Sequence, residues 1–139
     1  MIRIRSCDLE NIITHCLEEN PIEACGVLAG YIKDPSGRIE KNVKKVYRCR
    51  NELKSSVEYR IEAEEQFKIF SKIEDSSLDL LGFYHSHPST RSEPSTIDRE
   101  RANYCGCSYV IVSLHPTKVS SWVLAKTGVF AEEDIYINE

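Results

Sequence analysis

Two histidines, a serine and an aspartate stand close together in the middle of the chain. His85 and His87 are separated by one residue, and Ser95 and Asp98 follow them. Imidazole nitrogens and a carboxylate oxygen are common ligands of Zn²⁺ in enzymes, where three protein ligands leave a fourth position for water. A zinc ion in such a site lowers the pKa of that water and polarises a substrate carbonyl. The residue types and their spacing therefore predict a catalytic metal site.

The apolar run before the histidines predicts a buried strand over residues 78–87. Residues two apart in a strand point to the same face. The residues expected on the metal-binding face are Leu81, Phe83, His85 and His87. Ser86 should point to the other face, and Asp98 would come from the first turn of a helix from about Thr96 to Tyr104.

Ser95 and Asp98 also have an ordinary structural interpretation. The pattern Ser-x-x-acid is typical of a helix start, where the serine caps the helix and the acid interacts with its dipole. Capping and metal binding are compatible, because a cap fixes the turn from which Asp98 would point toward the metal.

Hydrophobic periodicity predicts helices interspersed among strands in a single α/β or α+β domain over residues 1–139. The other two helices are expected at residues 9–17, ending before Pro21, and from Glu62 to about residue 73. The other strands are expected at residues 2–5, 25–32, 38–50, 57–61, 108–114 and 120–125, with a final strand or hairpin partner over 129–137. A turn at residues 34–37 would join the second and third strands into a hairpin.

The composition limits the partners and the compartment. A net charge of −4 with dispersed basic residues argues against a nucleic-acid partner. No apolar run has the length of a membrane helix. The first residues lack the apolar core of a signal peptide, so we expect a cytoplasmic protein. Nothing in the sequence indicates its oligomeric state.

Six cysteines are even in number, which would suit a disulfide framework in a small secreted protein. In a reducing compartment they are expected to be small buried side chains, although cytosolic disulfides do occur in hyperthermophiles. The cysteines are Cys7, Cys16, Cys25, Cys49, Cys105 and Cys107.

The central stretch resembles the signature of the JAMM (MPN-plus) metalloproteases. The resemblance rests on His85-Ser86-His87 followed by Ser95 and Asp98, with Gly82-Phe83-Tyr84 in front. It extends to the segment 23–30, EACGVLAG, which is similar to the prokaryotic form of an upstream segment that carries a glutamate. The resemblance therefore implies a JAMM/MPN fold of the α/β class, with a mixed β-sheet flanked by about three helices and a cytidine-deaminase-like core.

The resemblance also implies a role for each matching residue. His85, His87 and Asp98 would hold one zinc ion per chain. Glu23 would take a proton from the zinc-bound water and pass it to the leaving amine. Ser95 would donate to the developing oxyanion or help hold the water. The expected function is cleavage of isopeptide or peptide bonds after the C-terminal glycine of ubiquitin-like modifiers or sulfur carriers. Composition alone does not select Glu23 among the glutamates.

The chain departs from linkage-specific eukaryotic deubiquitinases between Leu114 and Lys118, where there is no room for a long insertion with further zinc ligands. A minimal prokaryotic type fits better. The loop from Asn51 to Tyr59 is either a border of the substrate tail or a solvated connector.

Three other functions compete with this expectation. A non-catalytic scaffold of the same fold, which binds conjugates or partner subunits, is the main alternative, although such scaffolds usually lack the ligands. A zinc nucleobase deaminase would need a glutamate at the position of His87 and another cysteine spacing. A cysteine hydrolase would use Cys25 as its nucleophile, but a small buried strand residue is the commoner role of such a cysteine.

Overall fold

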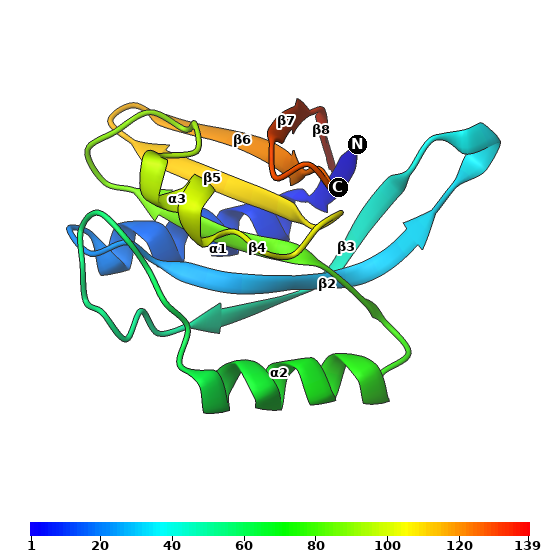
Figure 1. Cartoon of the computed structure of the whole chain (residues 1–139), viewed down its shortest axis with the longest axis horizontal. Helices are drawn as coiled ribbons and strands as arrows, with labels where there is room; N and C mark the ends of the chain where they lie inside the picture. The colour runs from blue at the N-terminus through cyan, green and yellow to red at the C-terminus, as the bar shows by residue number, and fades with distance from the viewer.

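An eight-stranded mixed β-sheet forms the centre of the structure, a computed structural model that describes residues 1–139 (Figure 1). The strand order is β7-β6-β5-β4-β2-β3-β1-β8. The strands are β1 (Ile2–Arg5), β2 (Cys25–Lys33), β3 (Glu40–Cys49), β4 (Asp79–His87), β5 (Ser108–Leu114), β6 (Thr117–Leu124), β7 (Phe130–Glu133) and β8 (Ile135–Asn138). The predicted α/β class with a mixed sheet is confirmed.

Three α-helices accompany the sheet: α1 (Ser6–Glu19), α2 (Ala63–Asp75) and α3 (Thr96–Arg101). Helices α1 and α2 pack on opposite faces, α1 behind the sheet and α2 below it in Figure 1. The α1-side core includes Ile12 and Tyr84, and the α2-side core includes Ile69 and Phe83. A short 3₁₀ turn, Pro35–Gly37, connects β2 and β3 as the composition predicted. No helix is long and apolar enough to cross a membrane.

A bulge in β4 corrects the predicted alternation of that strand. Leu28 pairs with Gly82 but Ala29 pairs with Leu80, so Leu81 is an extra residue in β4. Leu81 consequently packs in the α1-side core, whereas Phe83 packs in the α2-side core. The prediction that these two residues share a face is wrong because a bulge shifts the alternation by one residue. The histidines lie beyond the bulge and keep the face of Phe83.

The predicted strand over residues 57–61 is also wrong. Only an isolated bridge between Asn51 and Ile61 forms there. The Asn51 side chain pairs with backbone groups that a neighbouring strand would otherwise bind. Its amide donates to the Glu58 carbonyl, and its oxygen accepts from the Arg60 amide. The segment is therefore a loop folded around one buried asparagine.

Two further boundaries differ from the prediction. Helix α3 ends at Arg101 rather than Tyr104, because the Tyr104 ring leaves the helix to pack against Phe83, with 5.0 Å between the ring centroids. The segment 129–137 forms two strands at opposite edges of the sheet, since β7 pairs with β6 and β8 pairs with β1. Strand β6 begins at Thr117, which shortens the predicted turn before it.

All six cysteines are free thiols. Cys16, Cys25 and Cys49 are buried, as expected of small core residues, while Cys7 and Cys105 are exposed. The sheet and its two cores thus form without a disulfide.

The close approach of Gly82 on β4 to Ser108 on β5 gives a direct test of the fold. A Cβ atom at Gly82 would lie 1.8 Å from the backbone oxygen of Ser108. Gly82→Ala should therefore lower the free energy of unfolding by roughly 3 kcal/mol, since backbone must move to relieve the overlap. Gly106→Ala is the control: its Cβ would meet nothing within 4 Å, and only the positive φ of 83° opposes it, at a cost of about 1 kcal/mol. Urea unfolding measures both, and equal losses would contradict the close approach.

Candidate metal centre

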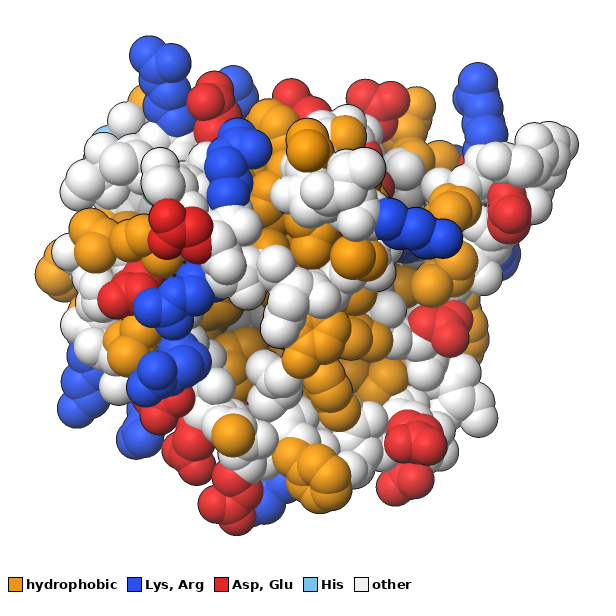
Figure 2. Space-filling view, in the orientation of Figure 1, with side chains coloured by type: hydrophobic (Ala, Val, Ile, Leu, Met, Phe, Trp, Pro, Cys, Tyr) orange, Lys and Arg blue, Asp and Glu red, His pale blue; other side chains and the backbone are white.

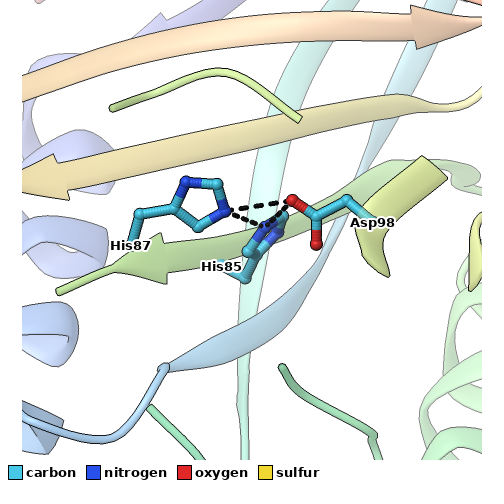
Figure 3. Close-up of side chains that lie close together, drawn as sticks. All are labelled: His85, His87 and Asp98. Carbon is cyan, nitrogen blue, oxygen red and sulfur yellow. Dashed lines mark hydrogen bonds and ion pairs between the residues drawn. The ribbon is translucent and has the colours of Figure 1, made fainter. Parts of the chain in front are cut away.

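The side chains of His85, His87 and Asp98 converge on one point at the end of β4 (Figure 3). The Nε2 atoms of the two histidines are 3.1 Å apart. Oδ2 of Asp98 lies 3.1 Å from Nε2 of His85 and 3.0 Å from Nε2 of His87. Strand β4 supplies both imidazoles on one face, and the first turn of α3 supplies the carboxylate. The structure therefore brings together the three residues that the sequence predicted as ligands.

The donor set fits a zinc ion. Ligands at the usual Zn–N and Zn–O lengths in a tetrahedral site are about 3.3 Å apart, close to the separations of the three atoms here. All three residues are buried. Both histidines direct their Nε2 atoms toward the same carboxylate oxygen, Oδ2 of Asp98.

The His87 ring is oriented by the loop that follows it. Its Nδ1 atom lies 2.6 Å from the carbonyl oxygen of Arg91. A hydrogen bond between the far ring nitrogen and a backbone carbonyl is the usual way in which proteins orient a metal-binding histidine. The His85 ring is instead held by stacking on Tyr59, with 4.6 Å between the ring centroids. Its Nδ1 atom is buried and has no hydrogen-bond partner.

The electrostatics favour the protonation states that a metal requires. Burial alone would raise the pKa of Asp98, but the two neighbouring imidazoles and the Ser95 amide hold that pKa well below its usual range. Burial lowers the pKa of His85 and outweighs the attraction of Asp98. For His87, burial is outweighed by hydrogen bonds to Asp98 and Arg91, which raise the pKa. The group thus contains a carboxylate and an imidazole that resists protonation, and metal binding needs both.

Ser95 lies next to the three ligands and caps α3. Its hydroxyl oxygen accepts a hydrogen bond from the Asp98 amide at 3.0 Å, and the Ser95 amide donates to Oδ2 of Asp98 at 2.9 Å. The structural role weighed for this pair is therefore present, as a complete capping box. Because the serine oxygen acts as an acceptor in this bond, its hydroxyl proton stays available to donate elsewhere.

Glu23 reaches the site from the segment just before β2. Cys25 pairs with His85 in the antiparallel register, and Ala24 exchanges hydrogen bonds with Ser86. Two residues before Cys25, the same register places Glu23 across from His87. Its side chain is buried, and its Oε1 atom has no hydrogen-bond partner. The structure thus places Glu23 across from His87, one of the three predicted ligands, and the role of Glu23 stays a prediction.

The environment of Glu23 favours the protonated acid in the metal-free protein. Burial raises its pKa to about 8, with further increases from Asp98 and Glu58 that outweigh the opposing effect of His87. A cation at the three ligands would lower that pKa again, because nearby positive charge favours the carboxylate.

A cavity of about 290 Å³ opens beside the ligands, between α2 and α3. His85 and Asp98 form part of its wall, and the other contributions are mostly apolar, including Tyr59, Phe83 and Tyr104. Figure 2 shows hydrophobic side chains gathered around the middle of this face of the molecule. Of the two interpretations of the loop from Asn51 to Tyr59, the position of Tyr59 on this wall favours a border of the binding site.

Cys25 does not have the properties of a nucleophile. Its side chain is fully buried, and burial raises the pKa of its thiol far above the ordinary value, with a smaller increase from Cys49. A reactive cysteine needs a lowered pKa and access to substrate. The structure therefore disfavours the cysteine-hydrolase alternative.

Sequence reasoning missed several residues that shape the site. The stacking of Tyr59 on His85 and the carbonyl of Arg91 on His87 had no sequence signal, since both lie in loops. Ser86 was expected to point away from the metal, and it does so. Its partner, the Ala24 amide, could have been inferred only from the pairing of β2 with β4.

A family model described as prokaryotic homologs of the JAB domain matches residues 8–125, most of the chain. The chain belongs to this family. The resemblance to JAMM enzymes inferred from the motif is thus confirmed.

Several known proteins are similar over most of their length. A desampylase of Haloferax volcanii is 38% identical over 108 residues, which are 75% of this chain and 74% of the relative. A CysO-cysteine peptidase of Mycobacterium tuberculosis is 32% identical over 136 residues, covering 95% of this chain and 88% of the relative. The solution structure of a Desulfitobacterium hafniense protein has a TM-score of 0.86 and 29% identity, covering 100% of this chain and 94% of that one.

The raised pKa of Glu23 predicts that the metal-free protein becomes less stable as the pH rises. The folded pKa of about 8 exceeds the value of 4.5 expected in the unfolded chain, so the folded state binds more protons between these pH values. Stability should therefore fall as the pH rises from about 5 to 8. Glu23→Gln removes this loss and should stabilise the metal-free protein by roughly 2–4 kcal/mol at pH 8, with little difference below pH 4.5. Urea unfolding in the presence of a chelator at both pH values measures the difference. A pH-independent effect of the substitution would contradict the raised pKa.

Proposed function

We propose that this protein is a zinc-dependent peptidase that cleaves after the C-terminal glycine of ubiquitin-like modifiers or sulfur carriers. The observation that carries the proposal is the convergence of the three candidate ligand atoms within 3.1 Å. Glu23, which the strand register places across from His87, has a buried carboxyl oxygen without a hydrogen-bond partner. A buried carboxyl oxygen without a hydrogen-bond partner is rare in a site that serves structure alone.

His85, His87 and Asp98 would hold the zinc ion, one per chain. When bound, zinc supplies a positive charge that acidifies water and polarises the scissile carbonyl. Glu23 would accept the proton of the attacking water and deliver it to the leaving amine, which is the role of a general base that later acts as an acid. Burial raises the pKa of Glu23 and a bound cation would lower it. These opposing effects suit the role, because a pKa near the working pH allows both uptake and release of the proton.

Ser95 would stabilise the negative charge that develops on the carbonyl oxygen. Its hydroxyl oxygen accepts a hydrogen bond from the Asp98 amide, so the capping box fixes the position of the hydroxyl group. The hydroxyl proton stays free to donate to the substrate oxygen. A donor that is already oriented costs no reorganisation when charge develops, which is the basis of oxyanion stabilisation.

The cavity beside His85 and Asp98 would receive the C-terminal tail of the modifier. It borders the metal ligands directly, and its apolar wall suits the carbon atoms of an extended peptide. Tyr59 would lie between the tail and the His85 ring on which it stacks.

The relatives support the same class of reaction. Their names describe a desampylase and a CysO-cysteine peptidase, and the match to the second covers 95% of this chain. We infer a peptidase of this class for the present chain. A non-catalytic scaffold that binds the same conjugates is the alternative, and the experiments below separate the two.

Zinc binding is expected to depend on the predicted ligands. The wild-type protein, stripped of metal and repleted, should bind one zinc ion, while His87→Ala should lose most of its affinity because two ligands remain. His115→Ala is the matched control, since His115 lies in an exposed turn away from the site. Elemental analysis after desalting measures the metal content. A wild type without stoichiometric zinc would overturn the proposed mechanism.

Cleavage is expected to depend on Glu23 without affecting zinc content. The substrate is a ubiquitin-like protein joined through its C-terminal glycine to a lysine-containing peptide. Glu23→Gln should keep zinc and lower kcat at least about 100-fold, the usual contribution of a general base. Glu65→Gln, on α2, should retain wild-type kcat, because that carboxylate accepts only from the Arg50 amide.

Two results would change the assignment. Full activity of Glu23→Gln would show that another group is the base. A zinc-loaded wild type that binds such conjugates and never cleaves them would favour the scaffold.

A further inference from the structure

The loop that connects the histidines to α3 is held by very few hydrogen bonds. Residues 88–94 contain no helix or strand and take part in no backbone-to-backbone hydrogen bond. Only two neighbouring carbonyl groups of this loop accept hydrogen bonds: that of Arg91 and that of Ser92. The position of the loop therefore depends on the partners of these two carbonyls.

The Arg91 carbonyl fixes the state of a metal ligand. It lies 2.6 Å from Nδ1 of His87. A carbonyl oxygen can only accept, so Nδ1 must carry the proton of a neutral His87 ring, and Nε2 has a free lone pair. That lone pair is directed toward Oδ2 of Asp98 and Nε2 of His85, where a metal would bind.

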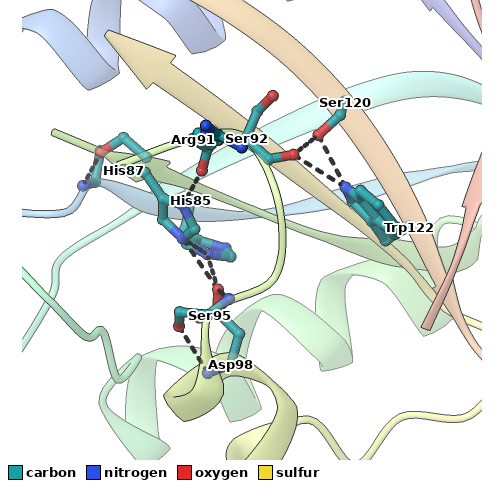
Figure 4. A network of polar contacts seen from close by, with 10 residues as sticks. His85, His87, Arg91, Ser92, Ser95, Asp98, Ser120 and Trp122 are labelled. Carbon is teal, nitrogen blue, oxygen red and sulfur yellow. Dashed lines mark hydrogen bonds and ion pairs between the residues drawn. The ribbon is translucent and has the colours of Figure 1, made fainter. Parts of the chain in front are cut away.

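The Ser92 carbonyl is held from the opposite side by β6 (Figure 4). It accepts from the hydroxyl of Ser120 and from the indole N–H of Trp122, the latter at 3.1 Å. The indole N–H also lies 2.9 Å from the Ser120 hydroxyl oxygen, so the three groups form one cluster. Ser92 and Ser120 are each only 5% exposed, so water has little access to replace these bonds.

The sheet connects this cluster to the metal ligands. His85 pairs with Ile111 on β5, and Ile111 pairs with Ser120 on β6, so Ser120 lies in the same cross-strand row as His85. Phe83 pairs with Tyr109 on β5, and Tyr109 pairs with Trp122 on β6, so Trp122 lies in the same cross-strand row as Phe83. A rigid sheet therefore carries both the histidines and the groups that hold the loop.

We propose that Ser120 and Trp122 are positioning residues for the metal site. By holding the Ser92 carbonyl, they keep the adjacent Arg91 carbonyl on His87 and so maintain the tautomer that binds metal. This inference rests on the proposed metal site, but part of its test needs neither metal nor activity.

The test uses the double variant Ser120→Ala/Trp122→Phe, which removes both donors and keeps the aromatic ring. Zinc affinity, measured by competition with a chromogenic chelator, should fall about tenfold, the lower end of the effects seen when groups behind a metal ligand are removed. In the metal-free, ¹⁵N-labelled protein, the wild type should show a slowly exchanging Nδ1 proton of His87, and the double variant should lose it.

Ser121→Ala is the matched control. Ser121 is a fully buried serine between the two positions on β6, and its hydroxyl donates to Glu133 at 2.7 Å, away from the loop. This variant should keep wild-type zinc affinity and the His87 proton. Trp122→Phe alone, which retains the Ser120 hydroxyl, should give a smaller loss and serves as the test if the double variant does not fold. Ser120→Thr, with Trp122 unchanged, keeps a hydroxyl donor and should bind zinc with wild-type affinity.

The outcomes separate this inference from the proposed function. A folded double variant with zinc affinity within twofold of wild type and a retained His87 proton would overturn the positioning role, as would an equal loss in Ser121→Ala. A wild type that does not cleave conjugates would contradict the peptidase proposal alone. If the wild type bound no zinc, the His87 proton would still decide whether Ser120 and Trp122 orient that ring.

Discussion

The antiparallel pairing of β2 with β4 is the constraint on which the candidate site depends. It places Cys25 beside His85 and joins Ala24 to Ser86 by two hydrogen bonds, and the same register places Glu23 across from His87. Two segments distant in sequence would thereby contribute the proposed base and the proposed metal ligands. Because a shift by one residue would turn every side chain to the other face, the site exists only in this register. The bulge at Leu81 lies before the histidines and leaves that part of the register intact.

The part of the site that sequence predicted is the part built from local geometry. Strand alternation places His85 and His87 on one face, and the Ser95 to Asp98 spacing sets a capped helix turn. Both depend on residues within a few positions of one another, so periodicity and capping rules capture them. The three helices and most of the strands were predicted for the same reason, since their apolar patterns are local, whereas the mixed sheet was implied by the family resemblance.

The parts that sequence missed depend on contacts between distant segments. The loop before α2 resembled a strand by composition, but the buried Asn51 side chain takes its backbone hydrogen bonds. Tyr104 was assigned to a helix and instead leaves it to pack on Phe83. Glu23 was selected by family resemblance rather than by physical pattern, because nothing in its local sequence sets it apart from a surface glutamate. Trp122 had the pattern of an ordinary strand residue, and its contact with Ser92 arises only after β6 joins the sheet.

The site also concentrates polar groups whose burial opposes folding. Two buried atoms, Oε1 of Glu23 and Nδ1 of His85, have no hydrogen-bond partner. Unpaired buried polar atoms are rare in proteins and often mark functional positions. A cation at the three ligands would offset part of this cost, which links metal binding to stability.

The central claim is that the metal is held by two imidazoles and one carboxylate. Zinc K-edge X-ray absorption of the repleted protein tests it most directly, because the chain also carries six cysteines that could compete. We expect a shell of only nitrogen and oxygen ligands at about 2.0–2.1 Å with imidazole scattering. A sulfur shell at about 2.3 Å would contradict it.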